Sequence, residues 1–169
     1  MEGQGTLIDE EVTGVIIAIL VVIGVFVAAQ FFISGKVAEP YSDLAILGPE
    51  GKLSDYPSQV AAGKSFNLSI YVGNHEGKVM YYAVLVKLGS VGTPINETNP
   101  MDAPEVERYE VVLTDGGNWT KQITLSVQDP GINRRLVFEL WVFDGEAQEF
   151  EYHSRWNQLW LNVTAPALP

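Results

Sequence analysis

Cysteine is absent from this chain of 169 residues, and histidine occurs only twice. The lack of cysteine excludes disulfide bonds, thiol chemistry and metal sites with cysteine ligands. His75 and His153 have no ligand-like spacing, so we expect no metal site. His75 lies in the segment Asn74-His75-Glu76-Gly77, and we interpret it as a turn residue that hydrogen-bonds to the backbone.

Positive charge is also scarce, with 10 Lys and Arg against 21 Asp and Glu, a formal net charge of −11. This balance argues against nucleic acid or anionic lipid headgroups as partners. The acidic pairs Asp144/Glu146 and Glu149/Glu151 lack the pattern of a calcium loop and are expected to solvate a loop. No nucleophile motif and no glycine-rich phosphate loop is present. We therefore expect neither a catalytic site nor a cofactor, and no enzyme activity.

The longest apolar run is Val12–Ile33, which has 22 residues and no charge. A helix of that length reaches about 33 Å, against a hydrocarbon core of roughly 30 Å. Its many β-branched residues disfavour a helix in water, but in lipid the backbone must satisfy its own hydrogen bonds. The run predicts one transmembrane helix, and the bilayer is therefore an expected partner.

Three other interpretations of this run are open. It could be the buried core helix of a soluble protein, although 18 or more uncharged apolar residues are typical of a membrane span. A cleaved signal peptide has a basic start and a shorter apolar core, whereas this start is acidic. The third is a leader similar to that of type IV pilins or archaellins, cleaved after Gly5 and leaving Glu10 at the fifth mature position. Such leaders usually carry Lys or Arg before the glycine, and Met1–Gly5 has neither.

The run divides the chain into five parts. These are an acidic tag (1–11), the transmembrane helix (12–33), a short juxtamembrane linker (34–40), one globular domain (41–164) and a tail (165–169). The globular part is large enough to hold a real core.

Two signals bear on the side of the membrane. Lys36 follows the helix, which by the positive-inside rule places the domain in the cytoplasm, although large domains translocate largely regardless of charge. The opposite signal is a set of four N-x-[ST] sequons at Asn67, Asn96, Asn118 and Asn162. With eight Asn and 17 Ser or Thr in the chain, chance predicts about one. We expect an extracytoplasmic domain with N-linked glycans, and all four asparagines exposed.

Period-two alternation dominates the globular part. In 65–73, Phe66, Leu68, Ile70 and Val72 alternate with polar residues, and 119–127 behaves in the same way. Seven strands are predicted, at 41–47, 65–73, 79–88, 109–113, 119–127, 134–143 and 158–163, with a long loop over 89–107. Asn74–Gly77 predicts a tight turn that makes 65–73 and 79–88 a hairpin near the sheet centre. This pattern predicts an antiparallel β-sandwich of the immunoglobulin-like type, with a small barrel as the alternative.

The strand over 134–143 breaks the usual pattern, because both of its faces are apolar. Leu136, Phe138 and Leu140 occupy one face, whereas Trp141 and Phe143 belong to the other. Together with later aromatic residues they predict a surface that docks another protein, another copy or the membrane interface. The alternative is that these side chains cover sheet ends or loops. The surface comprises Trp141, Phe143, Phe150, Tyr152, Trp156 and Trp160.

A set of ordered motifs resembles a known family. They are Leu47-Gly48-Pro49-Glu50-Gly51-Lys52, Tyr56-Pro57, Asn74-His75-Glu76-Gly77, Pro130-Gly131-Ile132-Asn133, Leu136-Val137-Phe138 and Leu159-Trp160-Leu161-Asn162-Val163. In this order they are similar to the soluble portion of an uncharacterised archaeal membrane-protein family, domain of unknown function 1616. The resemblance implies an archaeal source, a β-domain outside the cell and a glycosylation system that uses the sequons. It brings no active site, and members often resemble a multi-span protein where this chain has a single span.

These observations predict a single-pass protein of the cell membrane with an extracytoplasmic domain. We expect it to be an accessory or scaffold subunit that binds other membrane or envelope proteins, or itself. The alternative is a filament subunit of pilin or archaellin type, processed after Gly5.

Overall fold

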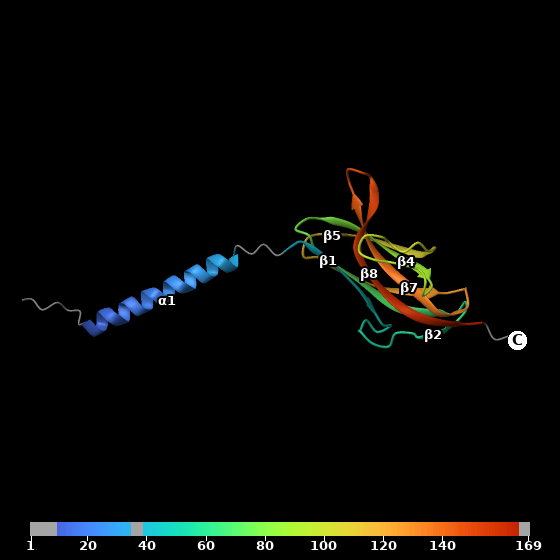
Figure 1. Cartoon of the computed structure of the whole chain (residues 1–169), viewed down its shortest axis with the longest axis horizontal. Helices are drawn as coiled ribbons and strands as arrows, with labels where there is room; N and C mark the ends of the chain where they lie inside the picture. Colours follow the sequence, from blue (N-terminus) through green and yellow to red (C-terminus); the bar gives the residue numbers. More distant parts are fainter. Residues whose placement is uncertain (1–9, 35–38, 166–169) are drawn as a thin grey trace, which may run out of the picture. The chain divides into compact units, whose positions relative to one another are not determined.

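The computed structural model describes residues 10–34 and 39–165, and it divides into two compact units between Glu39 and Pro40 (Figure 1). The first unit holds one helix, and the second holds all the strands. The predicted cleavage point after Gly5, most of the acidic tag, linker residues 35–38 and tail residues 166–169 lie outside the described residues.

Helix α1 comprises Glu10–Ser34, and within it Val12–Phe31 is long and apolar enough to cross a membrane. The large apolar side chains of this stretch are 45% to 84% exposed. The core helix of a soluble protein buries an apolar stripe against its own fold, whereas none of this stretch is buried. The helix therefore has the length and the apolar surface that a membrane span requires.

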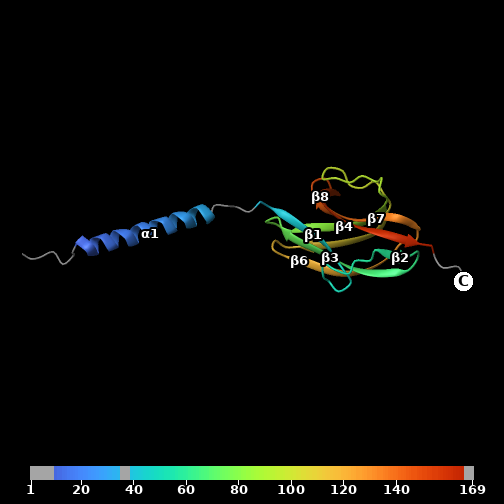
Figure 2. The ribbon, with the colours of Figure 1, turned by 60° about the horizontal axis from the view of Figure 1, so that its bottom comes forward.

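The second unit is an all-β sandwich with eight strands in two sheets. Figure 2 shows the sheets as two layers. One has the order β1-β3-β6 and the other β2-β8-β7-β4-β5, and every pairing is antiparallel except the parallel pair β2–β8. The order β1-β3-β6 against β8-β7-β4 corresponds to strands A, B, E against G, F, C of the immunoglobulin fold. The strands are β1 Tyr41–Leu47, β2 Gln59–Ala61, β3 Ser65–His75, β4 Met80–Gly89, β5 Glu105–Leu113, β6 Asn118–Ser126, β7 Gly131–Asp144 and β8 Glu149–Thr164.

The core lies between the sheets and follows the predicted alternation. Leu68, Ile70 and Val72 of β3 are fully buried, and they face Phe138 and Leu140 of β7 across the core. Because side chains alternate across a strand, each sheet contributes every second residue to this core. The predicted β-sandwich, preceded by one apolar helix, is thus confirmed.

The predicted hairpin between 65–73 and 79–88 is wrong. Strand β3 pairs with β1 and β6, whereas β4 pairs with β5 and β7 in the other sheet. The turn signal was real, but a turn also reverses the chain when it crosses between sheets. Buried Asn74 stabilises this crossing, because its side-chain amide donates to the carbonyl oxygens of Lys78 (2.8 Å) and Leu113 (2.9 Å).

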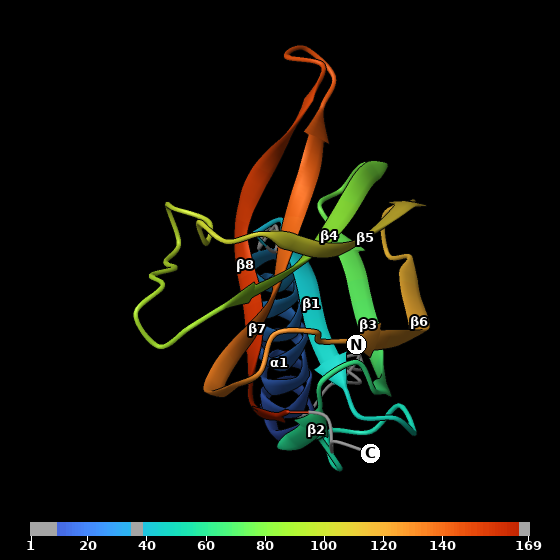
Figure 3. The same ribbon diagram turned by 90° about the vertical axis from the view of Figure 1, so that its right-hand side faces the viewer.

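The last strand is much longer than the predicted 158–163. Strand β8 begins at Glu149, and with β7 it forms a hairpin that projects beyond the rest of the sandwich (Figure 3). The pairing moves from Leu140↔Arg155 directly to Trp141↔Tyr152, so β8 contains a two-residue bulge at which Ser154 has a φ of +55°. The bulge and the polar residues around it hide the alternation in the sequence. Two further strands differ from those predicted from the sequence. Strand β2 was not predicted, and β5 begins at Glu105, within the predicted loop 89–107.

Candidate interaction surface

The outer face of the five-stranded sheet gathers the six aromatic residues that the sequence singled out. Trp141 is paired with Tyr152, and Phe143 with Phe150. Trp156 and Trp160 continue the same face of β8, opposite Glu139 and Arg135 of β7. Trp160 is 42% exposed, and the other five are half-buried. A single strand pair therefore positions the whole set.

Part of this face is covered by the segment 90–104, which connects β4 to β5. Figure 2 shows this loop on the side of the five-stranded sheet that faces away from the three-stranded one. Beneath it lie Val137 and Glu139, both fully buried on the outer face of β7. This cover explains why β7 is apolar on both faces. Part of the predicted docking surface, including Tyr152 and Trp156, thus lies against or beside the protein's own loop.

A buried ion pair fixes that loop to the sheet. Glu139 is fully buried, and its carboxylate accepts from Lys87 Nζ (3.0 Å), Trp141 Nε1 (3.0 Å) and the backbone N–H of Met101 (2.6 Å). Lys87 Nζ also donates to the carbonyl oxygen of Met101 (2.9 Å). A buried carboxylate is tolerated only when its charge and its lone pairs are matched in this way. The network is therefore structural, and it joins β4, β7 and the loop.

A second set of contacts holds the other end of the loop. Arg135 donates to the carbonyl oxygen of Thr93 (2.8 Å), and its guanidinium lies 5.4 Å from the ring of Trp156 and 5.5 Å from that of Trp160. Tyr152 donates its hydroxyl to the carbonyl oxygen of Asn96 (3.0 Å). Burial, with the nearby negative charges of Glu139 and Glu97, raises the pKa of Tyr152 to about 12.

The part of the face near the projecting hairpin is left open. The rings of Tyr81, Phe143 and Phe150 form a cluster with centroid distances of 5.0–5.6 Å. Val112, which is paired with Tyr81, and Val79, which directly precedes β4, are each 61% exposed. We call these five residues the aromatic patch.

Charged groups border the aromatic patch. The guanidinium of Arg108 lies 4.6 Å from the ring of Phe150 and forms an ion pair with Glu110. The hydroxyl of Tyr81 donates to the Glu110 carboxylate, which lowers the pKa of Glu110 and raises that of Tyr81. Apolar rings bordered by charges are typical of a protein-binding surface.

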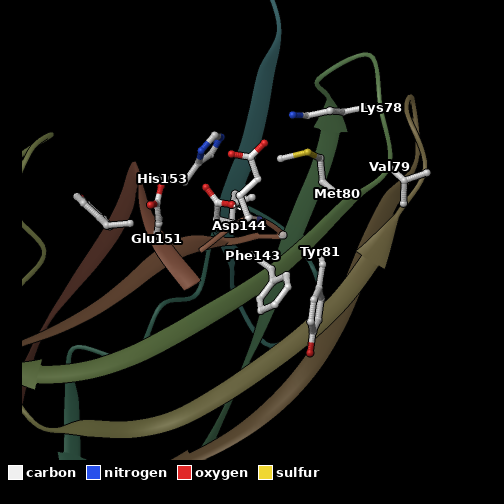
Figure 4. Close-up of a pocket in the computed structure, with 12 residues that line it drawn as sticks. Lys78, Val79, Met80, Tyr81, Phe143, Asp144, Glu151 and His153 are labelled. Atoms are coloured by element: carbon white, nitrogen blue, oxygen red, sulfur yellow. Dashed lines mark hydrogen bonds between the residues drawn. The ribbon is translucent and has the colours of Figure 1, made fainter. Parts of the chain in front are cut away.

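Beside the aromatic patch, along the projecting part of the β7–β8 hairpin as far as its turn, lies a polar cleft of about 500 Å³. In Figure 4 the rings of Tyr81 and Phe143 point together to one side, and the side chains of Met80, Glu151 and His153 point to the other. The rest of the lining includes the charged residues Lys78, Asp144 and Glu146. Backbone N–H groups of Ala147 and Glu146 donate to Asp144 and lower its pKa.

Beside this cleft a buried polar cluster joins the two sheets. Ser42 Oγ, in β1, lies 2.6 Å from Glu76 Oε1, 2.8 Å from the hydroxyl of Tyr82 and 3.0 Å from His153 Nε2. The Tyr82 hydroxyl also donates to Asn74 Oδ1 (3.2 Å), and burial raises its pKa. Sequence reasoning missed this cluster. Its members come from separate strands and from the segment after β3, so no local pattern in the sequence joins them.

The cluster contains serine, histidine and glutamate, but not in the geometry of a catalytic triad. In a triad, one ring nitrogen faces the serine and the other faces the acid. Here His153 Nε2 contacts both Ser42 (3.0 Å) and Glu76 (3.1 Å). Ser42 is also only 2% exposed, and it donates to the carboxylate. The arrangement supports cross-linking of the sheets rather than nucleophile activation.

His75 is not the turn residue that the sequence predicted. It is the last residue of β3, its ring stacks on Tyr41 at 4.6 Å, and its Nε2 lies 3.5 Å from the Asp43 carboxylate. The strand continues through Asn74 and His75 because both pair with β1. No group of three or more His, Asp or Glu within residues 10–34 and 39–165 is arranged to hold a metal ion.

The four sequons lie in different settings. Asn67, Asn96 and Asn118 are exposed, at the outer face of β3, in the loop over the sheet and at the start of β6. Asn162 is half-buried in β8, where its Oδ1 accepts from the backbone N–H of Asn133 (3.0 Å). The expectation that all four are exposed is therefore met at three positions.

Fold and surface together define a class: an all-β sandwich domain that follows one helix long and apolar enough to cross a membrane. The chain belongs to the family described as domain of unknown function (DUF1616), whose pattern matches residues 35–162. The resemblance that the sequence motifs suggested is thereby confirmed at the level of the family. No curated protein matches the sequence.

Solved structures of similar shape share little sequence with the chain. The CARDB domain of a Pyrococcus furiosus protein has 13% identity and a TM-score of 0.47, covering 75% of this chain and 96% of that one. A β-glucosidase from Listeria innocua has 14% identity and a TM-score of 0.41 over 75% of this chain, which spans only 17% of the enzyme. A complex of human zinc 2-glycoprotein and prolactin-inducible protein gives 9% identity and a TM-score of 0.45, covering 76% and 98%.

Proposed function

We propose that this protein is a single-pass membrane protein whose β-sandwich lies outside the cytoplasm and binds another protein, as an accessory or scaffold subunit of a membrane or envelope complex. The observation that carries the proposal is helix α1. Its stretch Val12–Phe31 is uncharged and predominantly apolar, and none of it is buried, which favours a position in lipid or against other transmembrane segments. An archaeal source, implied by the family resemblance, is part of the proposal.

The aromatic patch supports the binding role. Contiguous apolar surface that the fold itself leaves uncovered is typical of protein–protein interfaces. Tyr and Phe are enriched in such interfaces, and bordering charges supply specificity. The patch lies beside the loop-covered region rather than beneath it, so it is available in the folded domain.

The external placement is supported by the sequons, since oligosaccharide transfer to asparagine occurs outside the cytoplasm. A direct test uses the absence of cysteine, because a single introduced thiol then has no background. Gly92 is exposed and has open space around it, so Gly92→Cys should leave the fold unchanged. We expect a membrane-impermeant maleimide to label this variant in intact cells. Labelling only after lysis would place the domain in the cytoplasm.

The binding role is tested by purifying the tagged protein from native membranes in mild detergent and identifying its companions. We expect one defined membrane or envelope protein, which the double variant Phe143→Ser/Phe150→Ser loses. The matched control is Tyr71→Ser, which removes a half-buried aromatic residue from the outer face of the other sheet. Retention of the companion by the patch variant, or equal loss in the control, would refute the patch as the interface.

The filament alternative predicts a different N-terminus. The intact mass of the native protein distinguishes the filament subunit from the membrane-anchored subunit. A mature chain that begins after Gly5 would support the filament subunit, whereas a retained N-terminus supports the anchor.

A further inference from the structure

A shallow cleft of about 540 Å³ lies between the loop 90–104 and strand β8. Its walls are Ile95, Asn96, Glu97 and Thr98 from the loop and Trp156 from the strand. Asn96 is a sequon asparagine, so a possible site of modification and an aromatic ring line the same cleft.

The side chain of Asn96 is held in one orientation. Its Oδ1 accepts from the backbone N–H of Thr98 (2.9 Å), the hydroxyl of Thr98 (2.9 Å) and the backbone N–H of Asn99 (2.8 Å). Its carbonyl oxygen accepts from the hydroxyl of Tyr152 (3.0 Å). These bonds use the amide oxygen and fix the amide plane. The amide nitrogen, which is the atom that carries an N-linked sugar, has no hydrogen-bond partner among the described residues.

The aromatic wall is supported from below. Arg135 lies 5.4 Å from the ring of Trp156 and 5.5 Å from that of Trp160, and it also donates to the loop at Thr93. Trp156 is half-buried and Trp160 is 42% exposed. Large indole surfaces therefore remain open beside a rigid sequon, on a loop that is itself fastened to the sheet.

We propose that an N-linked glycan is attached to Asn96 and that its first sugars lie in this cleft against Trp156. A pyranose ring presents apolar C–H groups on its faces, which pack on an indole, while its hydroxyls stay in water. The covalent link makes the contact intramolecular, so a weak interaction is sufficient to hold it. The glycan then covers part of the aromatic face that the loop leaves open. This inference rests on the proposed extracytoplasmic placement of the domain.

The other sequons provide the comparison. Asn67 is exposed on the outer face of the three-stranded sheet, where its Oδ1 accepts from the hydroxyl of Thr124 (2.9 Å). Its neighbours across the sheet are polar, so a glycan there extends into solvent. Asn67 is thus the matched site at which a glycan gains no aromatic contact.

The test compares one sequence with and without its glycan. The full-length chain with Asn67→Gln, Asn118→Gln and Thr164→Val keeps Asn96 as its only sequon. It is produced in an N-glycosylating host and in a non-glycosylating host, purified in the same detergent and checked by intact mass. All four tryptophans lie in the β-domain, so their fluorescence reports its unfolding.

We expect the glycan to raise the Tm by about 2–5 °C and to reduce quenching of tryptophan fluorescence by acrylamide. In Trp156→Ala the Tm difference between hosts should fall by at least half, and in Trp156→Phe it should persist. The unglycosylated variants show whether each substitution itself permits folding. A chain that keeps only the Asn67 sequon should have the same Tm from both hosts.

The outcomes separate this inference from the proposed function. Glycosylation of Asn96 with an equal Tm gain in Trp156→Ala would overturn the stacked glycan alone. So would an unmodified Asn96 in a chain whose Asn67 carries sugar. If the unsubstituted chain from a glycosylating host carries no sugar at any of the four sequons, both the inference and the extracytoplasmic placement fail.

Discussion

The ion pair between Lys87 and Glu139 gives the sharpest test of how the loop 90–104 is held. Glu139 is fully buried and Lys87 is 12% exposed, with 3.0 Å between Nζ and Oε2. Lys87→Met keeps an unbranched apolar side chain, one atom shorter than lysine, but leaves a buried carboxylate without its cation. Removal of one partner from a buried pair costs about 3–5 kcal/mol, and the geometry here places the effect in that range.

The expected loss of stability in Lys87→Met can be expressed as a change in Tm. For a β-domain of roughly 125 residues, 1 kcal/mol corresponds to about 3–5 °C, so a loss of about 3–5 kcal/mol in Lys87→Met should lower the Tm by about 9–25 °C. Glu139→Gln should cost less, because a neutral amide still accepts from Met101 and the lysine can reach solvent. Thermal unfolding followed by tryptophan fluorescence measures both variants.

The matched control is Lys64→Met, which removes an exposed lysine. Equal Tm values for Lys64→Met and Lys87→Met would refute a structural role for the pair. The double variant Lys87→Met/Glu139→Leu removes both charges, and it should recover much of the lost stability. Its loop should nevertheless exchange amide hydrogens faster than the wild-type loop, because Met101 N–H has lost its acceptor.

Three further predictions follow from single contacts. The pKa of Tyr152 is about 12 in the folded protein against about 10 when unfolded, so the free energy of unfolding should fall as pH rises from about 10 to about 12. Denaturant titration of the wild type and of Tyr152→Phe measures this slope, which should be smaller in the variant. Ser42→Ala should cost about 1–3 kcal/mol in the same assay, because Glu76 loses its 2.6 Å donor in a part-buried site. Gly48→Ala should cost roughly 1–3 kcal/mol, because a Cβ there would lie 1.9 Å from the backbone oxygen of Ser54.

Each of these has its own contradicting result. If the free energy of unfolding falls with pH as steeply in Tyr152→Phe as in the wild type, a group other than Tyr152 causes the fall. A fully stable Ser42→Ala would show that water replaces the hydroxyl without cost. For Gly48→Ala the control is Gly92→Ala, whose Cβ meets nothing within 4 Å. Equal stability of the two glycine variants would contradict the close backbone approach at Gly48.

The fold class was predictable because its signals are local. An uncharged apolar run as long as Val12–Ile33 favours a helix in lipid wherever it occurs. Alternation such as that of Phe66–Val72 places one side of a strand in a core whatever its partners are. The sheet to which a strand belongs is not local information. Both β3 and β4 fit a hairpin by sequence, and only the packing of the sandwich separates them.

The candidate surface was only partly predictable, for a related reason. The sequence identified aromatic residues on a face where polar ones are usual, but it could not show that the loop 90–104 covers part of that face. The anchoring depends on Glu139, whose partners Lys87 and Met101 are distant in the sequence. The cluster around Ser42 likewise combines residues from three separate segments.

The sequence alone determined the exposed apolar helix, the β-sandwich and the aromatic composition of one face, because each depends on the periodicity or length of a continuous segment. Only the tertiary structure decided which aromatic residues stay open and which are covered. It also decided that Asn96 shares a cleft with Trp156, since these two residues are far apart in the sequence and meet only after the loop folds back over β8. Contacts between distant segments require the whole domain to close, and no local pattern specifies them.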